Sequence, residues 1–247
     1  MLWVLLAFHA LNLAILNHNP IHPELIRGSI GLNKVLQNLT LIDSLLDELQ
    51  HGLKTCHLQP PLQDRPYPAS KVDQPPLSDN EQRHVAGLMR VNNAGEVAAQ
   101  GLYRGQSLTA RDPVIKAAMN AAANEENEHL NWCQQRLSEL KQGRSKLDGI
   151  WYWGSFTIGA VAGIAGDKWS LGFVKETEEQ VYQHLQEHIS RLPESDQRSR
   201  SILETMKDDE LQHAINADRA GAAPLPKVVK LAMTAVSKVM TFTAYRI

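Results

Sequence analysis

The sequence predicts an all-α protein built around a four-helix bundle. Stretches rich in Ala and in Glu, Gln and Leu dominate the chain, while aromatic residues make up 6% of it, and this composition favours helix over sheet. Apolar residues recur at helical spacing over several long segments. Two of these segments carry a Glu-x-x-His pair on their apolar stripe, Glu126/His129 and Glu210/His213.

Composition excludes some classes of protein. At 247 residues the chain is long enough to bury a sizeable core. A formal net charge of −2 gives no electrostatic reason to expect nucleic acid as a partner. The two cysteines, Cys56 and Cys133, do not indicate a disulfide scaffold, and isolated thiols suit a reducing compartment. We therefore expect an intracellular helical protein.

Residues 1–77 are expected to lie outside the bundle domain. Residues 1–16 are nearly all apolar, but they lack a basic flank and are shorter than the roughly 20 residues of a membrane span. An interfacial anchor and a start codon placed too far upstream both stay open for them. Residues 31–50 predict an amphipathic helix, and the recurring prolines of residues 59–77 predict a linker or an extended arm.

The bundle domain is expected to span residues 78–247, and capping signals set the start of its first two helices. Ser78 and Glu81 form a capping-box pattern, and the helix that they open runs to about residue 108. Asp112 as cap and Pro113 at the first helical position open the second helix, which continues to about residue 142.

Four further segments complete the domain. Residues 150–166 are apolar and rich in glycine and aromatic residues, and they lead into a third helix over 168–191. Pro193 is expected to begin the fourth helix, which lasts to about residue 220. The last segment, residues 225–243, predicts an amphipathic helix with lysines among apolar residues.

The first and third helices of the bundle each carry one lone glutamate on the apolar stripe, Glu96 and Glu178. Glu178 aligns with Val174 and Val181, whereas its acidic neighbours point elsewhere. A third Glu-x-x-His pair, Glu81/His84, is set aside because Glu81 closes the capping box and His84 lies on another face.

Two Glu-x-x-His pairs and two single glutamates are the ligand set of a di-iron or di-manganese site in a bundle. Four buried glutamates carry a formal charge of −4, which two divalent cations would balance, and unpaired buried carboxylates cost several kcal/mol. Two adjacent ferrous ions, about 4 Å apart, would deliver two electrons to one O2 molecule. The residues expected to bind metal and to carry catalysis are Glu96, Glu126, His129, Glu178, Glu210 and His213.

Two further acids lie one turn before the histidines. Asp209 is four residues before His213, and Glu125 is four before His129. Each is expected to reach across and orient the imidazole of the other helix, with a solvated helix-face acid as the alternative. His184 and His188 are interpreted as ordinary histidines.

Four segments in order resemble the demethoxyubiquinone hydroxylase family, from about Ser78 to the C-terminus. They are RVNNAGEVAAQGLYRGQ, EENEHL, SLGFVKETEEQVYQHL and DDELQHA. The resemblance implies a ferritin-like fold with two irons per subunit held by the six residues, Glu126 and Glu210 bridging. It implies an O2-dependent monooxygenase that hydroxylates a polyprenylated 3-demethoxy-benzoquinol, with other ubiquinone-biosynthesis proteins as possible partners. The apolar start at residues 1–16 departs from the family pattern.

A prenylated substrate requires the enzyme to meet a membrane. Residues 150–165 are too short to span one, and Trp151, Tyr152 and Trp153 stand at their start, where aromatic side chains favour the bilayer interface. Glycines in this segment allow close helix approach. We expect this segment and the C-terminal helix to form a membrane-facing mouth, on the cytoplasmic side of the cell membrane. The alternative is an internal core helix.

Other readings of the same residues stay open. A ferroxidase or a manganese catalase would use a similar bundle, and a non-catalytic scaffold of a quinone-biosynthesis complex would leave the six inward residues unexplained. The chain has no Gly-x-Gly-x-x-Gly pattern after a strand, so a nicotinamide or flavin domain is not indicated, and the electron donor is open.

Overall fold

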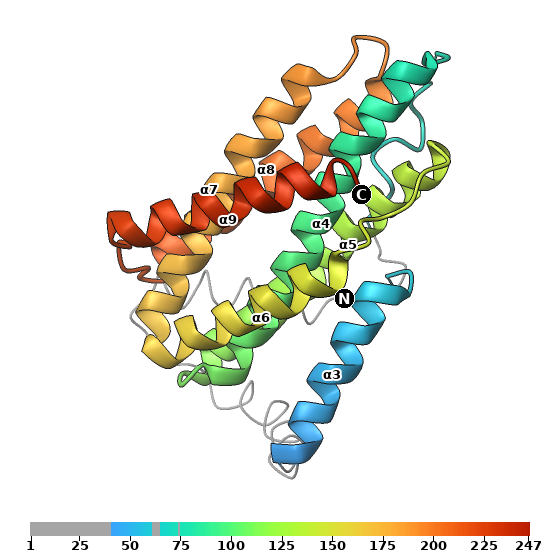
Figure 1. Ribbon diagram of the computed structural model, residues 1–247. Coiled ribbons are helices and arrows are strands. Elements are labelled where there is room, and N and C mark those ends of the chain that lie inside the picture. Colours follow the sequence, from blue (N-terminus) through green and yellow to red (C-terminus); the bar gives the residue numbers. More distant parts are fainter. Residues whose placement is uncertain (1–40, 61–64, 74) are drawn as a thin grey trace. The chain divides into compact units, whose positions relative to one another are not determined.

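The computed structural model describes residues 41–60, 65–73 and 75–247, and all regular elements in these ranges are helices (Figure 1). The all-α prediction is confirmed. The chain divides into two compact units, residues 1–53 and 54–247. Helix α3, Leu41–His57, begins in the first unit and ends in the second, seven residues past the predicted end at residue 50. The apolar segment 1–16 and the start of the predicted helix 31–50 lie outside the described residues.

Four helices of the second unit carry the predicted metal-binding motifs (Figure 1). Helix α4 packs against α5 and α7 against α8, while contacts of α4 with α7 and of α5 with α8 join the two pairs. Their largest core cluster includes Leu88, Leu137 and Leu203, all almost fully buried. Burying each such side chain contributes about 1.5–3 kcal/mol. The bounds are α4 Asp79–Thr109, α5 Pro113–Glu139, α7 Asp167–Arg191 and α8 Gln197–Arg219.

The predicted caps of the first two bundle helices are confirmed. The Ser78 N–H donates to Glu81 Oε2 at 2.8 Å, and the Glu81 N–H donates to Ser78 Oγ at 3.4 Å. Asp112 Oδ1 accepts from the Val114 N–H at 2.8 Å, with Pro113 as the first residue of α5.

The start of α8 differs from the prediction at Pro193. Asp196 caps the helix instead, because its Oδ1 accepts from the Ser199 N–H at 3.1 Å. Arg136 of α5 binds the same oxygen at 2.8 Å and donates to Ser199 Oγ. The Asp196 carboxylate accepts a hydrogen bond from a backbone N–H of the first turn, which proline cannot do because its side chain has no acceptor.

Helix α6, Asp148–Ala165, lies along α4 through glycine contacts. A Cβ on Gly101 would overlap the Tyr152 carbonyl, and a Cβ on Gly159 would overlap the Leu102 carbonyl. Only glycine allows these backbones to approach so closely. Tyr152 is fully buried, so its predicted place at a bilayer interface is wrong. The opposite face of α6 is apolar and more than 60% exposed at Ile150, Val161 and Ile164.

Helix α9, Lys227–Ala244, contacts α4 and α7, as α6 also does (Figure 1). Lys230 of α9 forms an ion pair with Glu176 of α7. The outer side of α9 exposes apolar side chains, among them Val228, Leu231 and Phe242. None of the helices in the described part of the chain has the length and apolar character needed to span a bilayer.

Residues 65–73 lie within the predicted linker and pack against the bundle. Ala69 is fully buried in the main core cluster. Arg198 of α8 donates to the Val72 carbonyl at 2.7 Å, and Ser201 donates to the Pro68 carbonyl at 3.2 Å. The domain division at residue 78 remains a prediction, although α4 does begin there.

Candidate metal centre

The six residues singled out from the sequence meet in the centre of the bundle. Potential ligand atoms of Glu96, Glu126, His129 and Glu210 all lie within 4.8 Å of one another, and so do those of Glu178, Glu210 and His213. Glu210 belongs to both groups. The four glutamates and His129 are buried, while the His213 side chain is 10% exposed. Each helix of the bundle supplies at least one of these residues from its inward face.

The carboxylates of Glu126 and Glu210 each face both imidazoles. Glu126 places Oε2 2.9 Å from His129 Nδ1 and Oε1 3.2 Å from His213 Nδ1. Glu210 places Oε1 3.1 Å from His129 Nδ1 and Oε2 3.5 Å from His213 Nδ1. Each carboxylate therefore offers one oxygen to each half of the cluster, which is the arrangement that a bridging ligand requires.

The outer nitrogen of each histidine meets an acid from the facing helix. His129 Nε2 lies 2.9 Å from Asp209 Oδ2, and His213 Nε2 lies 3.2 Å from Glu125 Oε2. This is the crossed pairing expected from the sequence. An acid at Nε2 keeps a proton on that nitrogen and turns Nδ1 toward the carboxylates, so Nδ1 is the nitrogen that would bind a metal in place of a proton.

Two residues of the centre had no role in the sequence-based interpretation. The buried Tyr103 hydroxyl donates to Glu178 Oε1. Tyr103 lies seven residues, about two turns, after Glu96, and its place on that stripe was a usable signal. Arg65 lies 2.8 Å from Asp209 Oδ2 and comes from the predicted linker. Its sequence neighbours carry no helical pattern that would place it here.

Burial and charge displace the pKa values of these groups in opposite directions. Burial raises the pKa of Glu96 and of Glu178 well above the usual range. Burial acts in the same direction on Glu126, but the neighbouring His129 and His213 bring the pKa of that carboxyl below its usual range. Burial opposes the charged form of His129, yet Glu126, Asp209 and Glu210 raise its pKa well above 6.5. Cations or protons must therefore compensate the negative charge of the cluster.

The donor set fits a pair of divalent metal ions. Three buried atoms at the centre, Glu126 Oε1, Glu210 Oε2 and His213 Nδ1, have no partner with hydrogen-bond geometry within the described part of the chain. His213 Nδ1 lies 3.2 Å from the Glu126 oxygen and 3.5 Å from the Glu210 oxygen, so the three atoms surround one space. Poorly paired buried polar atoms cost free energy, and metal ions bound between them would satisfy all three. Carboxylate with imidazole is a donor set that suits iron and manganese.

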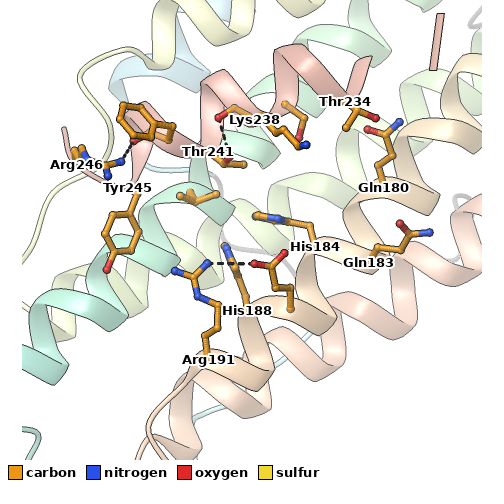
Figure 2. Close-up of a pocket in the computed structure, with 14 residues that line it drawn as sticks. Gln180, Gln183, His184, His188, Arg191, Thr234, Lys238, Thr241, Tyr245 and Arg246 are labelled. Atoms are coloured by element: carbon orange, nitrogen blue, oxygen red, sulfur yellow. Dashed lines mark hydrogen bonds and ion pairs between the residues drawn. The ribbon is translucent and has the colours of Figure 1, made fainter. Parts of the chain in front are cut away.

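A separate pocket of about 640 Å³ lies between α7 and α9. Figure 2 shows Gln183, His184 and His188 facing Lys238 and Thr241 across it. His188 is buried, and burial lowers its pKa to about 2, so its ring is neutral. Its Nδ1 lies 3.0 Å from Oδ1 of Asn92, which is one turn before Glu96 on α4. His188 is thus less ordinary than the sequence suggested, because it connects a pocket wall to the helix that carries the candidate ligand Glu96.

Comparison with known proteins places the chain in a family. Residues 83–244 match the family described as "Ubiquinone biosynthesis protein COQ7". The chain belongs to this family. The match runs from the first turns of α4 to the end of α9 and includes all six residues of the candidate centre. The resemblance inferred from the four sequence motifs is confirmed.

Similar proteins from several bacteria carry one name, 3-demethoxyubiquinol 3-hydroxylase. The protein of Nitrosococcus oceani is 53% identical over 209 residues, which are 85% of this chain and 98% of that protein. That of Dechloromonas aromatica is 51% identical over 204 residues, or 83% and 98% of the two chains. That of Acinetobacter baylyi is 50% identical over 212 residues, or 86% and 100%.

Proposed function

We propose that this protein is an O2-dependent monooxygenase that hydroxylates 3-demethoxyubiquinol in ubiquinone biosynthesis. The single observation that carries the proposal is the buried cluster of four glutamates and two histidines in a COQ7-family chain. Relatives at about half identity over most of both chains carry the name of that activity. We further propose two irons per chain, held by Glu96, Glu126, His129, Glu178, Glu210 and His213, and a substrate with a polyprenyl tail.

The protein's own residues would hold and shield this centre. When bound, a pair of ferrous ions supplies two electrons to one O2 molecule. Glu126 and Glu210 would bridge the two halves, since each already faces both imidazoles. The Asp209 and Glu125 carboxylates keep the Nδ1 atoms of the histidines turned inward. The near-complete burial of the glutamates excludes bulk water from the reacting groups.

We also propose that the protein binds the cytoplasmic surface of the cell membrane peripherally, through α6 and α9. Both helices pack on α4 and α7 and expose apolar side chains, including Val161, Ile164 and Phe242. Trp151 and Trp153 pack against buried clusters, so substitutions there would disturb the fold as well as the surface.

Replacing Val161 and Ile164 together by Glu should lower co-sedimentation with liposomes, whereas Val114→Glu, at a half-exposed valine of α5, should not. Equal binding of all three proteins would contradict the membrane surface.

A strain that lacks the gene tests the reaction. It should accumulate the demethoxy-quinone, and the wild-type chain should restore ubiquinone while Glu210→Ala should not. Normal ubiquinone in a cell that depends on Glu210→Ala would refute the assignment.

Metal analysis separates the remaining alternatives. About two irons per chain support the hydroxylase, whereas manganese would favour a catalase and no metal would favour a scaffold. A ferroxidase would also bind iron, but it would oxidise Fe(II) without hydroxylating the quinol.

A further inference from the structure

Arg65 lies outside the bundle helices and far in the sequence from α5 and α8, yet its guanidinium contacts residues of both helices beside the candidate metal centre. It precedes residues 83–244, which match the family. Its Nη1 is 2.8 Å from Asp209 Oδ2 and 3.2 Å from Glu128 Oε2. The guanidinium carbon also lies 4.9 Å from the centroid of the Trp132 ring. Since these partners belong to α5 and α8, Arg65 joins the two helices that carry the Glu-x-x-His pairs.

The segment that delivers Arg65 is attached by contacts outside the metal centre. Ala69 is buried in the main core, and α8 holds the Val72 and Pro68 carbonyls through Arg198 and Ser201. These contacts hold the backbone beyond Arg65 in place without it. The conformational entropy lost when the guanidinium pairs is therefore smaller than for an arginine on a free chain.

Arg65 and His129 share one oxygen of Asp209. Oδ2 lies 2.8 Å from the guanidinium and 2.9 Å from His129 Nε2. Because two donors hold this oxygen, the carboxylate cannot easily rotate away from the imidazole. The hydrogen bond from the guanidinium is charge-assisted, and such bonds are stronger than those between neutral groups. Trp132, over which the guanidinium lies, has its own ring 5.4 Å from the His129 ring. Arg65 thus contacts both neighbours of His129 on this side: it pairs with the Asp209 carboxylate and lies over the Trp132 ring.

We propose that Arg65 is a positioning residue for the reaction, which acts through Asp209 to set the orientation of His129. The inference rests on the proposed function, because it requires iron at the six residues. Removing a side chain that orients a ligating histidine typically lowers metal affinity about 10–100-fold. Arg65 is one contact further out and its side chain is 46% exposed, so a three- to tenfold loss of Fe(II) affinity in one half of the centre is expected.

The test compares variants of the full chain loaded with ⁵⁷Fe(II) under anaerobic conditions. Arg65→Ala should lower the affinity for one of the two irons and change the Mössbauer quadrupole splitting of that iron only. Arg65→Lys, which keeps the charge without the planar fork, should recover part of both. Arg83→Ala, at an exposed arginine hydrogen-bonded to Asn80, removes the same charge away from the centre and should match the wild type. Thermal unfolding confirms that each variant folds.

A double variant decides whether Arg65 acts through Asp209. If it does, Arg65→Ala added to Asp209→Asn should cause no further loss of iron affinity, because residues that act in one chain of contacts are not additive. Fully additive losses would overturn the proposal, and so would a wild-type Mössbauer spectrum in Arg65→Ala. Failure of the wild type itself to bind iron would instead refute the proposed function, and with it this inference.

Discussion

The two halves of the candidate metal centre use the same residue types but hold them differently. In the half around His129, the ring is 2% exposed and its acid, Asp209, is paired with Arg65. In the half around His213, the ring is 10% exposed and its acid, Glu125, has a side chain 37% exposed. Within the described ranges, no arginine or lysine forms an ion pair with Glu125, whose only ion-pair contact is with His213 itself. A symmetric ligand pattern thus does not imply symmetric support, because Arg65, from outside the bundle, pairs with the acid of the His129 half, and no described residue outside the bundle does so for Glu125.

The second half has a different support. The Tyr103 hydroxyl donates to Glu178, which lies with His213 and Glu210 in that half. One half is therefore stabilised at its histidine by a partly exposed charge pair, and the other at its glutamate by a buried hydroxyl. We expect the former to depend on ionic strength and the latter to depend on it little.

Glu210→Ala should have the largest effect, since Glu210 belongs to both groups of potential ligand atoms and faces both histidines. We expect hydroxylation to fall by at least about a hundredfold and iron content to fall below about one per chain. Far-UV circular dichroism should retain most of the wild-type helicity, because the helices are stabilised by separate core clusters. Wild-type turnover in a folded Glu210→Ala protein would show that the two halves do not share this ligand.

Asp209→Asn and Glu125→Gln compare the two halves directly with nearly isosteric changes. Asp209→Asn should lower Fe(II) affinity about 10–100-fold, the range usual for acids that orient ligating histidines. Glu125→Gln should lower Fe(II) affinity less than about tenfold. The Glu125 side chain is more exposed than that of Asp209, and its contact with His213 is longer, at 3.2 Å. Anaerobic Fe(II) titration measures both. Equal losses would mean that the support of the two histidines is equivalent after all.

Tyr103→Phe should have an intermediate to small effect on the His213 half. Metal binding would require the Glu178 carboxylate to be charged, and a buried hydrogen bond to a charged group contributes about 1.5–3 kcal/mol, of which the bound metal would compensate part. We expect about a fivefold to tenfold loss of affinity for one iron, at unchanged helicity. Mössbauer spectra should then show the opposite iron from the one that Arg65→Ala alters. A change in the same iron would contradict the division into halves.

Salt should produce the smallest effect and should act on the His129 half. The Debye length falls from about 10 Å at 0.1 M to about 3 Å at 1 M salt, which weakens a partly exposed pair such as Arg65–Asp209. On going from 0.1 M to 1 M salt, we expect the Fe(II) affinity of the wild type to fall about twofold more than that of Arg65→Ala. An identical salt response in the two proteins would argue against a role for this ion pair.

Much of the centre could be predicted because helical periodicity converts sequence spacing into direction. Stripe alignment selected Glu178, which faces the cluster, over Glu179, and it assigned Glu81 to a capping box. His84, the partner of Glu81 in the pattern, in fact contacts the Tyr245 hydroxyl and the Arg191 carbonyl, away from the cluster. The crossed Asp209–His129 contact followed from the same geometry.

What sequence could not supply depends on packing between segments without a shared period. The proline-rich residues before Ser78 have no periodicity, so nothing indicated that Ala69 is buried or that Arg65 reaches Asp209. The start of α8 was misplaced because the Asp196 cap depends on Arg136, a residue of another helix. Both contacts become visible only in three dimensions.

Anaerobic titration of the metal-free full chain with ⁵⁷Fe(II), followed by Mössbauer spectroscopy, would show whether the protein holds a two-iron centre with two differently supported halves. We expect saturation at about two irons per chain, with two distinct sub-spectra of equal area. Asp209→Asn should perturb one sub-spectrum and Glu125→Gln the other. Saturation at one iron, absence of binding, or a single sub-spectrum that both variants change alike would contradict a two-iron centre with two differently supported halves.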